Sequence, residues 1–555
     1  MTTTLYRGGV VHSAADPFAE ALLVADGVIT WIGADDTADG LAHRADRVID
    51  LDGALVAPGF VDAHVHTLET GLALHGVDLS ASAGVHGLDD ALAAIRRAVD
   101  ARPAGDADDV LRAFGWDETT WPEHRAPTRA EVDAAARGAR VYAARVDVHS
   151  AVVSSALAEA AGLARLDGWT DEGWVTGDAH HAARDAARDL SAARRTAVYR
   201  DVLEHAARRG VVAVHENSAP HIDTRAGLRE LLDMTRDPAS GLPLVVGYRG
   251  ELCVTSDDAR DLAADVPGLT GIGGDLDVDG SIGSRTAALR HPYADLGGDL
   301  APGAGGPDGR GLLYLRAEQV ANHLSAVTAA GLQGGFHVIG DRAMDEFLLG
   351  LRVAGETSGN GPIRAARHRV EHAPMVDASA LATLLLFGVH LSVQPAFDAT
   401  WGGRDGMYAT RLGATRIDGM NAFADLAAAG VPLAFGSDAP VTPVDPWGAV
   451  RACLEHADTD QRISARAAFR AHTRGGWRLA GLDGTGAGEI RVGAPAHLAV
   501  WRAEHLAVQG GKARTSSWST DARSGTPLLP ALGADEPAPE CLQTVRDGVV
   551  LHDTF

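Results

Sequence analysis

The sequence predicts an α/β protein whose main part is an eight-fold parallel β/α barrel of the TIM type. From about residue 200 to 480, short apolar strands alternate with helices, as in "AVYRDVLEHAARRG" followed by "VVAVHE". Repeated strand-helix-strand units form parallel sheets. Together with an earlier strand that ends at His66, the chain has enough units for a closed ring. The functional groups of such a barrel lie at the carboxyl ends of its strands.

Three further regions are predicted around this pattern. Residues 1–55 and 481–555 contain short strands with Asp-Gly turns, and we expect the two ends of the chain to build one small β-sandwich together. Residues 56–480 hold the barrel. Within it, residues 73–200 are rich in Ala, Arg and Asp, and they predict a helical insert after the first barrel strand.

Composition limits the classes of partner. The 555 residues carry a formal net charge of −25, which disfavours a nucleic-acid partner because phosphate binding depends on clustered Lys and Arg. We find no signal-peptide pattern and no apolar run long enough to span a membrane. Three scattered cysteines fit neither a disulfide framework nor a thiolate zinc site. We therefore expect a cytoplasmic protein with a small-molecule substrate and no membrane partner, which could form a homodimer.

The stretch "VAPGFVDAHVH" places His64 and His66 where the first barrel strand ends. Side chains alternate along a strand, so the two imidazoles point the same way and can share one ion. However, 24 histidines in 555 residues give roughly one His-x-His pair by chance. From the local pattern alone, a metal-ligand pair and two unrelated histidines are equally plausible.

Three later strands end in the same kinds of residue. His337 ends "GGFHVIGD", His372 ends "RHRVEHAP", and Asp438 ends "LAFGSDAP". Imidazole and carboxylate groups are natural ligands of zinc and similar ions. Each of these residues taken singly is more often a core or loop residue. A barrel, however, would direct all of them, with His64 and His66, at one cavity.

Several ordered motifs resemble the amidohydrolase superfamily, specifically its long branch that includes N-substituted formamide deformylases. They are "PGFVDAHVH", "DGSIGSRTA", "FHVIGDRA", "RVEHAPMV", "LSVQP" and "AFGSDAPV". The resemblance runs over nearly the whole chain, and it implies a metal-dependent hydrolase barrel with a β-sandwich built from both termini. Carried over position by position, it implies the metal ligands His64, His66, His337, His372 and Asp438.

One position departs from the family. Many relatives carry a lysine four residues before the Asp of the "DGS" motif, carboxylated so that it bridges two metals, whereas this chain has Asp275. The only lysine, Lys512, lies in the C-terminal loop region, so a carboxylated-lysine bridge is excluded. An aspartate reaches roughly 5 Å less far, and can bridge only if the backbone or the metals move inward. We expect one divalent metal, Zn²⁺ by preference, and leave open both a second metal with Asp275 as ligand and a solvated loop role for Asp275.

This metal site implies hydrolysis. A bound Zn²⁺ lowers the pKa of its water from about 16 to about 7. Asp438 would accept the water's proton and pass it to the leaving nitrogen, and His372 would polarise the carbonyl if it is not a ligand. We expect an amidohydrolase that cleaves a non-peptide C–N bond of an N-acyl or N-formyl amine. A deaminase of an aminated heterocycle is the alternative, and an inactive binding barrel would predict a broken ligand set.

Five further residues are predicted to contact the substrate: Arg285, His215, Glu216, Trp116 and His149. Each has a second interpretation. Arg285 follows the fourth strand and fits a structural ion pair equally well. His215 and Glu216 end the second strand, where they could instead orient a ligand histidine. Trp116, like its neighbour Trp121, could belong to the core of the insert.

Overall fold

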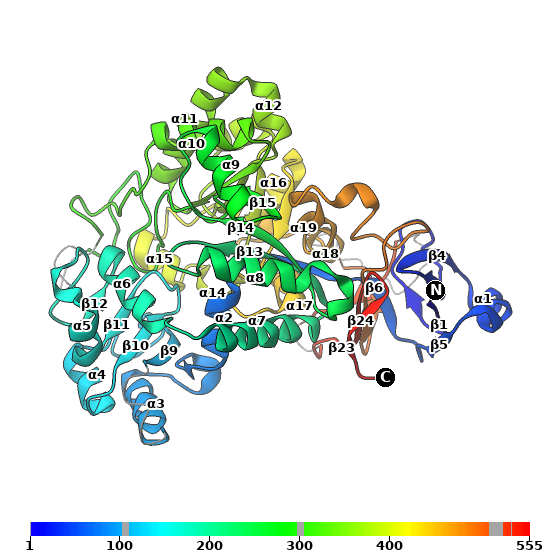
Figure 1. The fold of residues 1–555 in the computed structure, drawn as a ribbon, viewed down its shortest axis with the longest axis horizontal. Coiled ribbons are helices and arrows are strands. Elements are labelled where there is room, and N and C mark those ends of the chain that lie inside the picture. The colour runs from blue at the N-terminus through cyan, green and yellow to red at the C-terminus, as the bar shows by residue number, and fades with distance from the viewer. Residues whose placement is uncertain (1, 103–109, 297–304, 510–525, 534–535) are drawn as a thin grey trace.

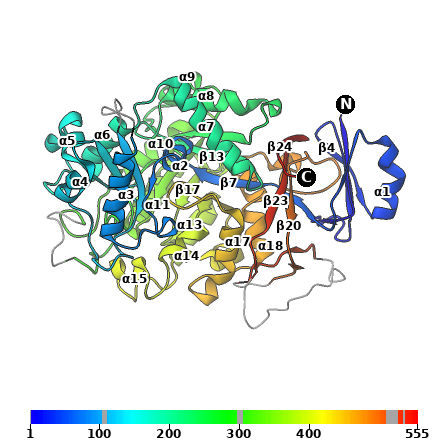
Figure 2. The ribbon, with the colours of Figure 1, turned by 90° about the horizontal axis from the view of Figure 1, so that it is seen from below.

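The computed structural model describes residues 2–102, 110–296, 305–509, 526–533 and 536–555. Lys512, the one lysine of the sequence, lies outside these described residues. Three parts stand side by side, with the insert at one end, the barrel in the middle and the terminal sheets at the other end (Figure 2). No helix in the described part of the chain is both long and apolar enough to cross a membrane.

Eight parallel strands form the central sheet, and their order in space follows their order in the chain. Three of them are labelled near the middle of Figure 1. They are β7 (Phe60–Val65), β13 (Val211–Ser218), β14 (Leu244–Arg249), β15 (Leu269–Ile272), β16 (Gln333–Val338), β17 (Arg369–His372), β18 (His390–Val393) and β19 (Leu433–Phe435). The segment after β19 closes the ring: Asp438 N donates to His64 O at 2.8 Å, and His66 N donates to Ala439 O at 3.0 Å. The predicted barrel is confirmed.

Helices surround the barrel, and most of them bury one face. They are α2 (Thr67–Leu74), α7 (Ala192–Ala207), α8 (Arg225–Arg236), α9 (Ser256–Asp265), α10 (Ala317–Ala329), α11 (Asp341–Ser358), α12 (Asn360–Ala365), α13 (Ala378–Phe387), α14 (Pro395–Trp401), α15 (Met407–Leu412), α16 (Phe423–Ala429), α17 (Pro446–Glu455), α18 (Ala465–Ala471) and α19 (Arg474–Leu479). In α8, for example, Leu228, Leu231 and Leu232 are buried at the spacing of one helical face. Thr224 caps the start of this helix, because its side chain accepts a hydrogen bond from the backbone amide of Gly227.

The insert contains the expected helices, and it also contains a five-stranded sheet, which corrects the prediction of a helical subdomain. The helices are α3 (Leu88–Asp100), α4 (Arg129–Ala136), α5 (Ser155–Ala161) and α6 (Gly177–Ala187), and the strands are β8 (Val77–Asp78), β9 (Leu111–Trp116), β10 (Val141–Arg145), β11 (Ala151–Val153) and β12 (Trp174–Val175). β10, "VYAAR", is buried along its whole length. Alanine favours helices, but burial between helices and neighbouring strands outweighs that weak preference.

Both ends of the chain meet in one pair of sheets next to the barrel. One sheet has the order β4-β3-β1-β5 and the other β2-β6-β20-β23-β24, so the second joins N-terminal and C-terminal strands. The strands are β1 (Thr3–Arg7), β2 (Val10–Val11), β3 (Ala21–Ala25), β4 (Val28–Gly33), β5 (Arg47–Asp50), β6 (Leu55–Pro58), β20 (Leu498–Arg502), β23 (Glu540–Arg546) and β24 (Val549–Asp553). Helix α1 (Asp35–Leu41) and the two-stranded sheet of β21 (Leu506–Ala507) and β22 (Leu529–Pro530) complete this part. The joint terminal domain is as expected.

Candidate active site

Four imidazoles and two carboxylates meet at the carboxyl-terminal mouth of the barrel. His64 and His66 lie at the end of β7, His337 in β16 and His372 at the end of β17. Asp275 follows β15 and Asp438 follows β19. The six side chains come from five strands that are far apart in the sequence. Their convergence is the geometric arrangement that the strand-end pattern predicted.

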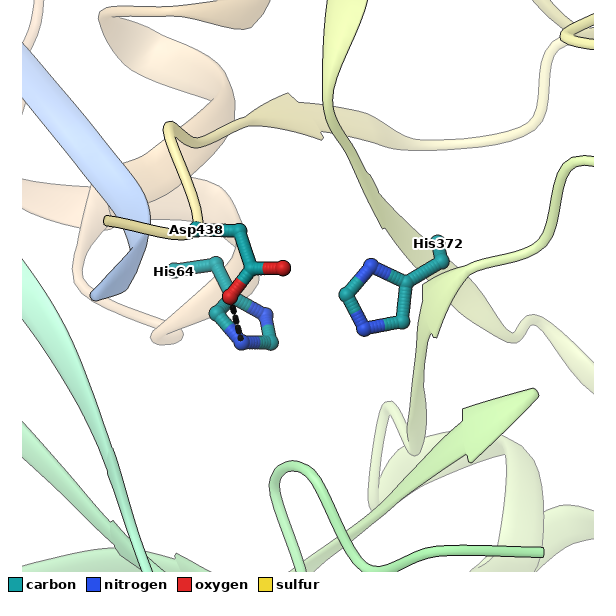
Figure 3. Close-up of side chains that lie close together, drawn as sticks. All are labelled: His64, His372 and Asp438. Carbon is teal, nitrogen blue, oxygen red and sulfur yellow. Dashed lines mark ion pairs between the residues drawn. The ribbon is translucent and has the colours of Figure 1, made fainter. Parts of the chain in front are cut away.

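His64, His66 and Asp438 form one group. The Nε2 atoms of the two histidines are 3.3 Å apart, and Asp438 Oδ1 lies 3.2 Å from His64 Nε2 and 3.3 Å from His66 Nε2. Figure 3 shows Asp438 directly beside the His64 ring, with the His372 ring facing both. Three potential ligand atoms this close together, on three buried side chains, can bind one ion from one side.

Asp275 lies between this group and a second pair of histidines. Its Oδ2 is 3.5 Å from both His64 Nε2 and His66 Nε2. Its Oδ1 is 3.2 Å from His337 Nδ1 and 3.3 Å from His372 Nε2. One carboxylate therefore faces two sets of ligands at once, with one oxygen toward each.

A glycine pair brings the short aspartate side chain into the mouth. Gly273 and Gly274 have φ angles of 108° and 67°, a region that favours glycine. A Cβ atom on Gly273 would lie 2.2 Å from Gly335 O, and one on Gly274 would lie 2.5 Å from Asn217 Oδ1. The backbone after β15 therefore runs close against its neighbours, which lets Asp275 reach where a longer side chain would otherwise be needed.

The electrostatics of the site favour a bound cation. Burial lowers the pKa of His64, but Asp275 and Asp438 outweigh that effect and raise it to about 9. Burial also lowers the pKa of His337, yet Asp275 raises it to about 10. Burial raises the pKa of Asp438, but the histidines beside it hold that pKa below its usual value. The two carboxylates thus stay ionised and attract positive charge into a buried site.

Buried partners orient the histidines from behind. His64 Nδ1 lies 2.7 Å from Glu371 Oε2, His66 Nδ1 lies 3.0 Å from Asn217 O, and His372 Nδ1 lies 2.8 Å from Gln394 Oε1. Such contacts fix the tautomer and the ring orientation of metal-binding histidines. The sequence analysis missed Glu371 and Gln394. Their signal was a polar residue within the fully buried strand motifs "RVEH" and "LSVQP".

A pocket opens beside the six groups. Its wall is mainly apolar and comes from helices α14 and α15 and from loops after several strands; the apolar side chains include Ile282, Ile339, Phe397, Trp401, Met407, Tyr408 and Val441. His337, His372 and Asp438 line the same cavity. A substrate held there would therefore have its reacting bond at the ligand cluster and an apolar part against the loops.

The structure places only one of the five predicted substrate contacts in this cavity. His149 lines the wall, with its ring 5.1 Å from that of His337. Burial and the nearby His337 lower the pKa of His149 to about 3, so its ring is neutral. Substrate contact by His149 remains a prediction.

The other four lie elsewhere, each for a physical reason. Trp116 is fully buried in the core of the insert, where its ring packs 5.9 Å from that of Trp121. Arg285 forms an ion pair with Asp295 at 2.6 Å. His215 and Glu216 are buried below the mouth: His215 Nδ1 is 3.3 Å from Arg369 Nη1, and Glu216 Oε2 accepts from the Thr67 amide at 2.7 Å. These four residues do not line the described pocket, and substrate contact by them stays a prediction.

The donor set fits a divalent ion of borderline hardness, since imidazole and carboxylate are the ligands that such ions take in hydrolases. All five ligands implied by the family resemblance are present and converge, whereas an inactive barrel predicted a broken set.

Comparisons with known proteins agree with this geometry. A model of the amidohydrolase family matches residues 47–552. The putative amidohydrolase YtcJ of Bacillus subtilis is 26% identical over 466 residues, 80% of this chain and 82% of YtcJ. The N-substituted formamide deformylase of Arthrobacter pascens is 30% identical over 150 residues, 27% of each chain. An uncharacterized metal-dependent hydrolase from Pyrococcus horikoshii has the same fold with a TM-score of 0.68 and 25% identity, covering 90% of this chain and 97% of that one. The chain therefore belongs to the amidohydrolase family and is a hydrolase that acts on carbon–nitrogen bonds.

Proposed function

We propose that the protein hydrolyses a non-peptide C–N bond of an N-acyl or N-formyl amine at a centre for two divalent metals, Zn²⁺ by preference. The observation that supports the two-metal centre is the position of Asp275, with one oxygen toward His64 and His66 and the other toward His337 and His372. The similarity to an N-substituted formamide deformylase supports the type of bond.

His64, His66 and Asp438 would hold one ion, His337 and His372 would hold the other, and Asp275 would face both. A divalent ion in such a site supplies an activated water and polarises a substrate carbonyl. Asp275 takes the place of the carboxylated lysine of relatives, because the backbone at Gly273 and Gly274 brings it close enough.

Asp438 would move the proton. Its carboxylate faces the ligand cluster and lines the cavity, so it can accept a proton from water and deliver it to the leaving nitrogen. Asp438 has a φ angle of 56°, which is unusual for a residue other than glycine, and its amide is tied to His64 O. The backbone is thus held where the carboxylate lies beside His64 and His66.

Metal analysis with product analysis tests the proposal. The purified protein, dialysed and then reloaded, should retain two metal ions per chain, and Asp275→Asn should retain at most one. Asp223→Asn is the matched control, because Asp223 is also buried but contacts Tyr199 and Thr224 rather than a site histidine. One ion per chain in the unsubstituted protein would contradict the two-metal centre. Release of ammonia from an aminated heterocycle, with no carboxylate from N-acyl amines, would favour the deaminase alternative.

A further inference from the structure

A second groove lies at the amino-terminal ends of the barrel strands, opposite the mouth that holds the ligand cluster. It runs between the turn before β17, the start of β19 and the helices α16, α18 and α19. Its charged lining residues are Arg367, Arg470, Arg474, Arg478 and Asp483. The rest of the lining is small or apolar, with Ala427, Gly430, Val431, Leu433, Ile463, Ala467, Ala471 and Gly475. Positive charge is therefore concentrated in one hollow of a chain whose formal net charge is −25.

Three of the four arginines have no carboxylate within hydrogen-bond distance. Arg470 and Arg478 are exposed, and their side chains form neither an ion pair nor a hydrogen bond with any residue that the structure describes. Arg367 has only Asp483, with Nη1 at 3.8 Å from Oδ1. Arg474 is the exception, because its Nη1 donates to Glu489 Oε1 at 2.5 Å. Three guanidinium groups thus line one groove without a close acid.

A buried histidine beside the groove is affected by two of these arginines at once. His390 is the first residue of β18, the strand between β17 and β19, and it is 6% exposed. Burial, and then the charges of Arg478, Arg367 and Arg369, lower the pKa of His390 to about 3. Guanidinium groups from α19 and from the turn before β17 therefore act on the same place, although they are far apart in the sequence.

The main chain that carries these side chains is held together. Gln333 Nε2 donates to both Arg367 O and Leu479 O, the second at 3.1 Å, so one side chain joins the turn before β17 to the end of α19. Helices α18 and α19 contact each other, as Figure 1 shows. A ligand would meet arginines whose backbone is already ordered, which lowers the entropic cost of binding.

The charges of the groove define the kind of ligand that fits it. A guanidinium group presents a planar fork of N–H donors that matches the two oxygens of a carboxylate or a phosphate. Like charges that line one hollow repel one another, and a multiply charged anion between them relieves this repulsion for all of them together. Three groups without a close acid therefore match an anion with two or three negative charges.

We propose that this groove is a second ligand site, which binds a compact oxyanion with two or three negative charges, either a phosphate monoester or a polycarboxylate. Arg470 and Arg478 would supply the main contacts, and Arg367 the third. This site is separate from the ligand cluster at the mouth, and the inference does not depend on the proposed function.

Titration calorimetry with anions of graded charge tests the site. The metal-loaded full chain is titrated at constant ionic strength with glycerol 3-phosphate, with tricarballylate and, as a monoanion, with acetate. We expect saturable binding of at least one polyanion, with a dissociation constant of about 1 mM or lower. Acetate should bind at least about tenfold more weakly, because it can complete fewer charged hydrogen bonds. The polyanion that binds more tightly identifies the ligand as a phosphate ester or a polycarboxylate.

A matched pair of double variants places the bound anion. Arg470→Gln with Arg478→Gln should weaken its binding at least about tenfold. Arg260→Gln with Arg404→Gln removes the same charge from exposed arginines that pair with Asp257 and Asp418, and it should bind the anion as the unsubstituted protein does. An anion held at the metal centre instead would bind both double variants equally, and that result would overturn the proposal.

Chemical protection gives a second measurement that needs no variant. The bound polyanion should slow the modification of Arg470 and Arg478 by phenylglyoxal, measured by mass spectrometry of peptides, and leave Arg260 and Arg404 unprotected. Equal protection of all four arginines, acetate binding as tight as that of the polyanions, or no saturable binding would contradict the proposed site. Self-association that is lost in the Arg470→Gln, Arg478→Gln variant, without binding of any anion, would assign the groove to a second copy of the chain and also overturn the proposal.

Discussion

Replacement of Glu371 by Gln should weaken metal binding although Glu371 is not itself a ligand. Glu371 is completely buried, and its Oε2 lies 2.7 Å from His64 Nδ1. Loss of a carboxylate that orients a ligand histidine lowers metal affinity about 10- to 100-fold, or about 1.4 to 2.7 kcal/mol. Because the contact is short and has no access to solvent, we expect a value near the upper end.

The same substitution should also destabilise the fold. Arg369 binds both Glu371 oxygens, with Nη2 at 2.8 Å from Oε2, and its guanidinium carbon lies 4.3 Å from the centre of the Tyr248 ring. Leaving a buried charge without its partner costs about 3–5 kcal/mol. Glutamine still offers an oxygen to Arg369, and Arg369 keeps a bond to Ala63 O at 2.8 Å. We therefore expect a loss near 3 kcal/mol.

Competition with a coloured chelator measures the metal affinity, and denaturant unfolding of the metal-free protein measures the stability. Asp223→Asn again serves as the control, since it also removes one buried carboxylate but should leave metal affinity unchanged. Unaltered affinity in Glu371→Gln, together with the expected loss of stability, would refute the argument that Glu371 acts through His64.

Three further outcomes are expected. Asp438→Asn should lower turnover about 10²- to 10⁴-fold, as loss of a general acid–base does. The metal content of the variant is measured alongside; if it falls as much as turnover does, the loss is due to weaker metal binding instead. Arg145→Met should destabilise the protein by about 3–5 kcal/mol in denaturant unfolding, because Asp117, Glu118 and Asp147 all pair with this buried guanidinium. Arg125→Met removes the more exposed ion pair with Glu131 and should cost at most about 1 kcal/mol. Equal losses in the two variants would contradict the argument. Acid should destabilise the fold through His323 and His368, because burial lowers their pKa to about 4 and about 3 from 6.5, so the unfolded state binds protons more tightly. The two histidines then make their full contribution to the free energy of unfolding above pH 6.5. This free energy falls by about 1.4 kcal/mol per pH unit for each histidine as the pH drops toward their folded pKa values. A free energy of unfolding that does not change between pH 7 and pH 5 would exclude this contribution.

The convergence of the five candidate ligands could be predicted from the sequence because the signal for each of them is local. His64, His66, His337, His372 and Asp438 each end an apolar strand, and a parallel barrel places all strand ends at one mouth. The reach of Asp275 was not predictable in the same way. It depends on the backbone at Gly273 and Gly274, whose φ angles follow from close packing against Gly335 and Asn217 rather than from any motif.

The predicted substrate contacts depended on residue type and approximate position alone. Trp116, Arg285, His215 and Glu216 do not line the described pocket, and each has partners elsewhere. Whether a polar side chain at a rim is paired or free depends on tertiary contacts far away in sequence. Asp147 shows the same dependence, because its Oδ2 accepts from Ser281 and Ser284, which are more than 130 residues away in the sequence.

The residues that close the barrel link metal binding to the stability of the ring. The ring is joined by Asp438 N to His64 O and His66 N to Ala439 O, and the side chains of Asp438, His64 and His66 belong to the proposed metal site. Removal of the metal by a chelator should therefore weaken the contact between β7 and the segment after β19, and amide hydrogen exchange should become faster first at this junction. A cell short of the metal would then lose the protein to proteolysis as well as losing its activity.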